Sequence, residues 1–154
     1  MREAQTMDAA NSIRREFTVS ADPATVFAFF TDPQRLIRWI GVSAELDPHP
    51  GGIFLVDVHS DRVACGEFKE VVPVSRLAYT WGWDGNLENV APGSSLIEID
   101  LLPNNGNTLV RFVHSGLPAE AVPGHSDGWT HYLGRLAIAA SGGDPGPDPR
   151  LSRS

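Results

Sequence analysis

The sequence is poor in cysteine, with Cys65 alone among its 154 residues. An internal disulfide is therefore impossible, and a reducing compartment fits this composition. Long apolar runs are also missing, because no stretch approaches the ~18 apolar residues that cross a membrane. The first residues lack the apolar segment of a secretory signal. These absences predict a cytoplasmic protein without membrane insertion.

Positive charge is scarce as well. The chain has 12 Lys and Arg residues against 19 Asp and Glu residues, a net charge of -7. Nucleic acids and anionic membranes bind basic patches, so we expect neither as a partner. Metal-ligand patterns are missing too, because His125 and His131 are not at the i, i+4 spacing that presents two ligands on a helix. We expect no metal and no cofactor.

Hydrophobic residues make up 42% of the chain, which is enough for one core. The length is typical of a single domain, which we place at residues 13–142. Residues 1–12 are polar and aperiodic, so they are expected to form a flexible leader. Residues 143–154 are rich in Gly and Pro, and we expect a flexible tail.

The clearest helical pattern covers residues 125–141. Its apolar side chains recur at i, i+3, i+4, i+7, i+8 and i+11, which places them on one face of a helix. They are Trp129, Tyr132, Leu133, Leu136, Ala137 and Ala140. Gly142 and Gly143 follow, where a helix C-terminus favours residues that tolerate positive φ.

The remaining elements follow from alternation and capping. Residues 13–20 alternate as a first strand, and Asp22-Pro23 and Asp32-Pro33 each predict the start of a short helix. Residues 42–115 predict about six further antiparallel strands joined by hairpin turns, of which Asn105-Gly106 is the clearest. A lone long helix after such strands must cover a sheet. The predicted fold class is therefore α+β.

The segment from Gly124 to Gly128 matches the G-x-S-x-G pattern of hydrolases. In those enzymes the serine lies on a sharp turn between a buried strand and a helix. The preceding residues, LPAEAVP, do not form such a strand, and a triad acid and His would have to follow Ser126. We favour a structural interpretation, in which Ser126 or Asp127 caps the long helix and Gly128 permits close packing.

Several polar residues have two open interpretations. His114 continues the apolar alternation of its strand, so it lies inside a cavity or is a paired core residue. Asp57 and Glu67 face either inward or outward. Arg15 lies on the apolar side of the first strand, where it reaches an edge or pairs with a buried acid. His131 lies at the margin of the helical stripe, as a structural or a ligand-facing histidine.

The order of one strand, two short helices, six strands and one long helix resembles the helix-grip fold of START and Bet v 1 proteins. Local sequence is more specific, and five segments resemble the family of the activator of Hsp90 ATPase homologue 1. They are ADPATVFAFFTDPQRLIRW, PGGIF, GEFKEVVPVSRLAYTWGW, NTLVRFVHSGLP and HSDGWTHYLGRL. Together they cover roughly residues 13–141.

This resemblance implies an apolar cavity between a curved antiparallel sheet and the C-terminal helix. Members of the superfamily bind lipids, hormones and aromatic compounds or act on them. We expect the cavity to be lined by aromatic residues and their neighbours. The candidates are Phe27, Phe30, Trp39, Phe54, Trp81, Trp83, Phe112, His114, Trp129 and Leu133.

Three functions remain open at this stage. The first is binding of a small apolar or aromatic molecule without catalysis. The second is a protein-interaction module that acts on a chaperone or another protein, as the resemblance to an Hsp90 activator in the stress response implies. The third is a cavity enzyme for an aromatic substrate, which would use His114 with Asp57 or Glu67.

Overall fold

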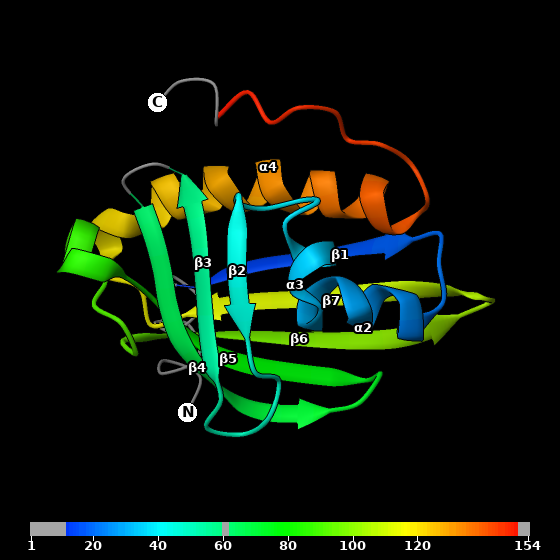
Figure 1. Ribbon diagram of the computed structural model, residues 1–154, viewed down its shortest axis with the longest axis horizontal. Coiled ribbons are helices and arrows are strands. Elements are labelled where there is room, and N and C mark those ends of the chain that lie inside the picture. Colours follow the sequence, from blue (N-terminus) through cyan, green and yellow to red (C-terminus); the bar gives the residue numbers. More distant parts are fainter. Residues whose placement is uncertain (1–11, 60–61, 151–154) are drawn as a thin grey trace.

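One antiparallel sheet of seven strands forms the framework of the computed structural model, which describes residues 12–59 and 62–150. The strand order is β1-β7-β6-β5-β4-β3-β2, so that β1 and β2 are the two edges (Figure 1). The strands are β1 (Ile13–Val19), β2 (Ser43–Leu46), β3 (Ile53–His59), β4 (Arg62–Val72), β5 (Arg76–Trp83), β6 (Ser95–Asn104) and β7 (Asn107–Ser115). The predicted α+β class is confirmed.

Two short helices connect β1 to β2, and both begin as their sequences predict. In α2 (Pro23–Thr31) the Asp22 carboxylate accepts a hydrogen bond from the Thr25 amide at 3.0 Å. In α3 (Pro33–Leu36) the Asp32 carboxylate accepts from the Gln34 amide at 3.0 Å. Each cap satisfies a backbone N–H group that the first helical turn leaves unpaired.

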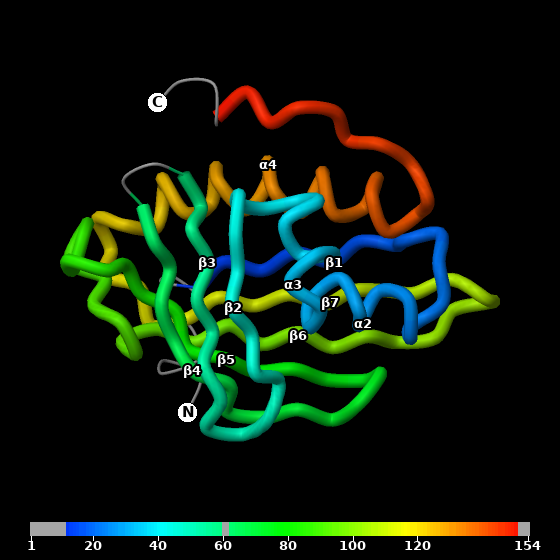
Figure 2. The backbone as a smooth tube through the Cα atoms, in the orientation of Figure 1, coloured from blue at the N-terminus to red at the C-terminus, as the bar shows by residue number. Residues whose placement is uncertain are grey.

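The sheet is strongly bent. In Figures 1 and 2, β2 and β3 cross the direction of β6 and β7, and β4 curves between the two directions. The pairing of β4 with β5 shifts register between Phe68 and Glu70, and the Glu67 amide donates to Thr80 Oγ1 at 2.9 Å. Gly66 permits this approach, because a Cβ atom there would lie 1.9 Å from the Thr80 carbonyl oxygen.

The long helix α4 (Val122–Ala140) covers the sheet above β1 (Figure 1). Its buried face confirms the predicted stripe in Trp129, Tyr132, Leu133, Leu136 and Ala140, and adds His125 and Ala139. The predicted start was wrong, because the helix begins at Val122 and no side chain caps it. Contacts to the sheet and to the C-terminal segment occupy Ser126 and Asp127 instead.

Alternation along the strands decides which side chains face the core. Phe54, Val56 and Val58 are buried, so Asp57 between them lies on the opposite face of β3. Ala64 and Phe68 are likewise buried in β4, so Glu67 lies on its opposite face, where Lys69 Nζ is 2.7 Å from its carboxylate. Neither acid faces the core, which answers the open question about both.

The hairpin between β6 and β7 turns at Asn105-Gly106, as predicted. Both residues have positive φ, 54° and 85°, the geometry of a type I′ turn. The sequence also predicts a hairpin turn at Ser60-Asp61, but these two residues and the predicted leader up to residue 11 lie outside the described residues. In the described part of the chain, no helix is long and apolar enough to cross a membrane.

We expect the Gly66→Ala substitution to destabilise the protein by about 1–3 kcal/mol, because the added methyl group meets backbone atoms of β5 that cannot move alone. Gly134→Ala is the matched control. Gly134 lies on the exposed side of α4 with nothing within 4 Å of a built Cβ, so alanine there should stabilise the helix by about 0.5–1 kcal/mol. Urea denaturation of both variants checks the pair, and equal effects would contradict the close approach at Gly66.

Candidate functional site

A pocket of about 280 Å³ lies between the N-terminal half of α4 and the ends of β3, β4 and β5, and it is partly open to solvent. Its walls combine large aromatic rings with charged side chains. The lining residues are Ile40, Val58, His59, Arg62, Trp81, Trp83, Glu88, Gly124, His125, Asp127, Gly128, Trp129, Tyr132 and Arg150.

Local backbone features create this space. The pairing of β3 with β4 shifts register between Asp57 and His59, and such a bulge turns side chains at a strand end. The 3₁₀ segment η1 (Asp84–Asn89) follows β5 and carries Glu88 at a φ of 56°, a conformation that non-glycine residues seldom adopt. On α4, Gly124 and Gly128 lie one turn apart and leave the helix surface bare.

Three tryptophans form the apolar wall. Trp81 lies between the other two, with its ring centroid 5.3 Å from that of Trp83 and 5.1 Å from that of Trp129. Trp81 and Trp83 alternate on one face of β5, whereas Trp129 comes from α4. The aromatic wall therefore joins the sheet to the helix across the pocket.

A chain of hydrogen bonds runs behind this wall. Trp129 Nε1 donates to His114 Nδ1 at 3.0 Å, so His114 carries its proton on Nε2 and donates to Ser95 Oγ at 2.9 Å. The Ser95 hydroxyl then donates to the Trp81 carbonyl at 2.5 Å. His114 is fully buried, and burial together with the nearby His125 lowers its pKa to about 3. It is a neutral, paired core residue.

His125 is the second buried histidine and lies at the pocket itself. Its Nδ1 donates to the Ala121 carbonyl at 2.8 Å, and its Nε2 accepts from Trp83 Nε1 at 3.1 Å. Burial is the largest cause of a lowered pKa for His125, partly opposed by the Ala121 carbonyl and Glu88. Both ring nitrogens are occupied, so His125 supports the wall in its neutral form.

Two buried polar atoms of the lining residues have no hydrogen-bond partner. They are the indole Nε1 of Trp81 and the hydroxyl of Tyr132. An indole N–H is a donor only, and a buried donor without an acceptor costs free energy. Among the described residues, the remaining unpartnered buried side-chain atom is Asp57 Oδ1, on the far face of β3.

Two arginines line the pocket, and each guanidinium lies near an aromatic ring. Arg62 is 5.3 Å from the centroid of Trp83 and forms an ion pair with Glu88. Arg150 is 5.7 Å from the centroid of Tyr132, and its Nη2 lies 2.9 Å from Asp127 Oδ2. Both arrangements add cation–π attraction to a charge pair.

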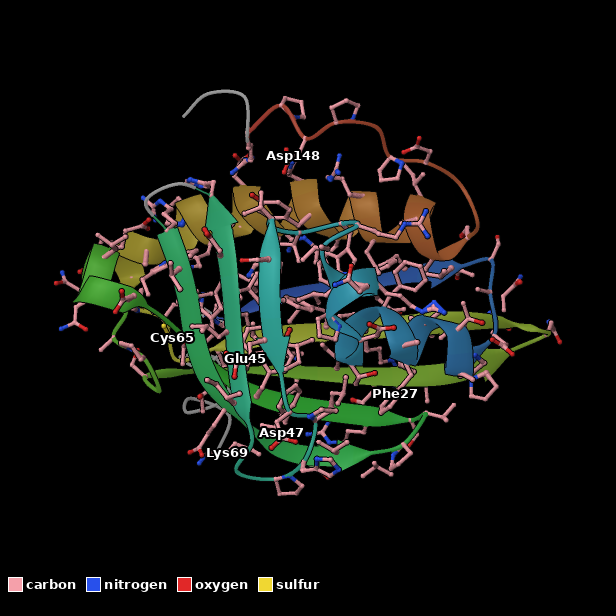
Figure 3. All side chains as sticks on the ribbon, viewed as in Figure 1. Phe27, Glu45, Asp47, Cys65, Lys69 and Asp148 are labelled. Atoms are coloured by element: carbon pink, nitrogen blue, oxygen red, sulfur yellow. The ribbon has the colours of Figure 1, made fainter. Side chains whose placement is uncertain are left out.

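Arg150 reaches the pocket because the segment after α4 turns back along the helix (Figure 1). Asp148, on this segment, is 6% exposed and accepts from His131 Nε2 at 2.8 Å and from the Arg150 amide at 2.9 Å. Figure 3 shows Asp148 between the segment and α4. The composition of residues 143–154 predicts a flexible tail, whereas residues up to Arg150 contact the helix; residues 151–154 are not described.

The structure brings together three of the predicted cavity residues, Trp81, Trp83 and Trp129. The other predicted residues lie outside the pocket lining. Phe30 packs edge-on against Trp39, Phe54 stacks on Tyr79, and Phe112 packs on Trp129. These rings fill the space between sheet and helices. The seven residues outside the lining are Phe27, Phe30, Trp39, Phe54, Phe112, His114 and Leu133.

Other predicted residues take structural roles. Arg15 binds α4, since its Nη2 donates to Ser126 Oγ at 2.8 Å and to Thr130 Oγ1 at 3.2 Å. Ser126 lies inside the helix. The G-x-S-x-G pattern therefore lacks the strand–helix turn on which the serine of such hydrolases lies. Within residues 12–59 and 62–150, no three His, Cys, Asp or Glu side chains are grouped to hold a metal ion.

Sequence reasoning missed the charged part of the pocket. Arg62, Glu88 and Arg150 come from three separate segments, and none of them belongs to a recognisable motif. One signal was available, because Gly128 places a bare position on the helix predicted over residues 125–141. Gly124 lay before the predicted start of that helix and joins the same face only because α4 begins at Val122.

The buried His114 makes stability depend on pH. Its folded pKa of about 3 lies below the ordinary value of 6.5, so the unfolded chain binds the proton first. The neutral His114 ring therefore contributes fully to the free energy of unfolding above about pH 6.5. As the pH drops toward 3, this contribution falls by at most ~1.4 kcal/mol per pH unit. Urea denaturation between pH 7 and 4.5 should show a steeper loss for the native chain than for His114→Gln. Equal pH dependence would contradict this assignment, and His49→Gln, at an exposed turn, is the control.

Similar proteins place this architecture in a family. The model of the family "Activator of Hsp90 ATPase homolog 1-like protein" matches residues 20–141. An AHSA1-like protein from Rhizobium etli is 55% identical, with 90% of this chain and 86% of that chain covered and a TM-score of 0.72. No protein of curated function matches the chain.

Two further structures share the fold at lower identity. DynU16, from the dynemicin biosynthetic locus, is 26% identical with a TM-score of 0.74, and the match covers 88% of this chain but 49% of DynU16. CalU16 from Micromonospora echinospora is 26% identical with a TM-score of 0.70, covering 92% of this chain and 80% of that chain. The resemblance found in the sequence is confirmed: this chain belongs to the activator of Hsp90 ATPase homolog 1-like family, within the Bet v 1-like fold.

Proposed function

We propose that this protein binds a small, largely apolar molecule in the pocket between α4 and the ends of β3, β4 and β5. The observation that carries the proposal is the pairing of a tryptophan wall with unpartnered buried polar atoms in the same lining, Trp81 Nε1 and the Tyr132 hydroxyl. Ligand pockets in proteins combine apolar walls with a few polar groups in this manner.

The volume limits the size of the ligand. A dry cavity of ~150 Å³ holds benzene, so the 280 Å³ of this pocket suits a molecule of one or two rings. Flat rings suit the wall, because Trp81, Trp83 and Trp129 present aromatic faces and edges at centroid spacings that favour tilted packing.

The predicted cavity residues outside the lining support the wall from behind. Phe112 packs against Trp129 with centroids 4.7 Å apart, and His114 holds the Trp129 indole by its hydrogen bond. In this proposal they fix the shape of the site, whereas the three tryptophans contact the ligand. Such support keeps a binding site in one conformation before the ligand arrives.

Binding fits the site better than catalysis with the predicted groups. The enzyme hypothesis required His114 with Asp57 or Glu67 at the cavity, but both acids lie on the opposite face of the sheet. His114 is buried behind Trp129 with both ring nitrogens occupied. These three side chains therefore cannot act together on a bound molecule.

A substitution that fills the pocket should abolish binding without unfolding the protein. Gly128→Leu places a branched side chain in the lining, and we expect it to weaken binding of the neutral naphthalene dye prodan by at least about tenfold. Gly134→Leu is the matched control, since it makes the same change in the same helix at an exposed position. Fluorescence titration of the dye measures both affinities.

Two outcomes of the prodan titration would contradict the proposal. If the native chain binds no prodan, or if Gly128→Leu and Gly134→Leu bind it equally well, the pocket is not the binding site. Both variants replace a helical glycine by leucine, so the change in helix propensity is the same in each and cannot explain a difference in dye affinity. Native mass spectrometry of the purified protein would then identify what it carries.

A second candidate function comes from the family itself, whose model covers residues 20–141. It is an interaction module that stimulates a chaperone ATPase. Addition of the native chain to a purified Hsp90 should then raise its ATPase rate, and Gly128→Leu should stimulate equally because the pocket would not take part. An unchanged rate argues against this candidate. A cytoplasmic location, which suits either function, stays a prediction.

A further inference from the structure

We propose that the pocket selects ligands that carry a carboxylate beside their apolar rings, and that Arg150 is the residue that binds this group. The inference rests on the proposed function and names the ligand class of the same site. The lining residues carry four groups that can donate hydrogen bonds. The guanidinium groups of Arg62 and Arg150 are partly exposed, whereas Trp81 Nε1 and the Tyr132 hydroxyl are buried.

The two carboxylates of the lining and the His125 ring are already paired with donors. Glu88 faces Arg62, Asp127 faces Arg150, and Nε2 of His125 accepts from Trp83. Trp81 Nε1 is an unpartnered donor, the Tyr132 hydroxyl can donate or accept, and the two guanidinium groups are donors only. A ligand with oxygen acceptors complements the guanidinium groups, and a carboxylate does so best because it also carries the opposite charge.

Arg150 is better placed than Arg62 to accept this partner. The Asp127 side chain, which pairs with Arg150, is 79% exposed, whereas the Glu88 side chain, which pairs with Arg62, is 33% exposed. Exposed ion pairs contribute little, so a ligand carboxylate can replace Asp127 at small cost. The planar guanidinium of Arg150 then offers paired N–H groups that match a carboxylate.

Arg150 contacts Asp148, Tyr132 and Asp127. The Asp148 carboxylate accepts from the Arg150 amide and from His131 Nε2, at 2.9 and 2.8 Å. The ring centroid of Tyr132 lies 5.7 Å from the Arg150 guanidinium carbon. Arg150 Nη1 lies 4.0 Å from the position that a Cβ atom would take at Gly128. The last distance is ordinary van der Waals contact, so a side chain longer than that of alanine at position 128 would compete with the arginine.

The segment from Gly143 to Arg150 thus acts as a strap that carries one wall of the pocket. A second contact holds the strap to the helix, where Arg135 Nη1 donates to the Pro145 carbonyl at 3.4 Å. Asp148 is a positioning residue in this arrangement, because it orders Arg150 without lining the pocket itself. The strap lies along α4 in Figures 1 and 3.

The test compares 2-naphthoate with its neutral methyl ester, which has the same ring system. We expect the native chain to bind the acid at least about tenfold more tightly than the ester, and Arg150→Gln to remove most of that preference while ester binding stays within about twofold. Isothermal titration calorimetry measures both ligands. Arg14→Gln, on the exposed outer face of β1, makes the same charge change and should keep the preference.

Two further variants sharpen the result. Asp127→Asn removes the competing carboxylate, so it should raise naphthoate affinity and leave the ester unchanged. Asp148→Asn should lower the ratio of acid to ester affinity, which a loss of general stability would not do. The preference should also decline as salt is added, because Arg150 and Asp127 lie at the pocket mouth.

The possible negative results separate the proposed function from the role of Arg150. If neither naphthoate nor its ester binds the native chain, the proposed function itself fails. If both bind with equal affinity, or if Arg150→Gln keeps the preference for the acid, ligand binding stands and the role of Arg150 is overturned. Loss of the preference in Arg62→Gln alone assigns the carboxylate to Arg62 and likewise overturns the proposal.

Discussion

The hydrogen bond from Trp129 to His114 is the interaction on which the arrangement of helix and sheet depends. Both side chains are buried, and an indole N–H buried without an acceptor costs free energy. His114 lies on β7, opposite Ile97 of β6 and Ile13 of β1, so the bond connects α4 to the interior of the sheet. The bond also sets the rotation of α4 about its axis. With Trp129 turned toward β7, His125 lies one turn earlier on the same face and reaches Trp83, and the pocket forms between these contacts.

The same aromatic composition fills one end of the molecule and leaves space at the other. Near α2 and α3, the Phe30 ring packs edge-on against Trp39, and Trp39 Nε1 donates to the Phe29 carbonyl, so rings and polar atoms are both satisfied. Beyond Trp81, Gly124 and Gly128 of α4 line the pocket together with residues from the ends of β3 and β4. The difference lies in the helices, since α2 and α3 supply bulky side chains while the first turns of α4 supply glycine. The hollow part is consequently short and lies beside charged groups.

Local patterns predicted the fold well because they depend on short-range physics. The caps at Asp22 and Asp32, the turn at Asn105-Gly106 and the alternation of β3 follow from backbone geometry within a few residues. The start of α4 does not, because Pro123 and Gly124 carry no apolar stripe and the first turns are stabilised by contacts such as His125 with Trp83. The same limit applies to the site. The three tryptophans share predictable faces, but Arg62, Glu88 and Arg150 meet only after β4, η1 and the strap have packed around α4.

If the pocket binds a ligand as proposed, the unpartnered donors connect the stability of the fold to the selectivity of binding. Trp81 Nε1 and the Tyr132 hydroxyl are buried without acceptors, and each such group costs about 1–3 kcal/mol in the unliganded protein. A ligand oxygen that reaches either group recovers part of this cost, whereas a plain hydrocarbon of the same size leaves the donors unpaired. Discrimination of this kind is far stronger than a hydrophobic wall alone can provide, because an added methylene changes affinity little while an unmet buried hydrogen bond changes it greatly. In the proposed function, the tryptophan wall supplies affinity, and the unpaired donors with Arg150 decide which apolar molecules can use it.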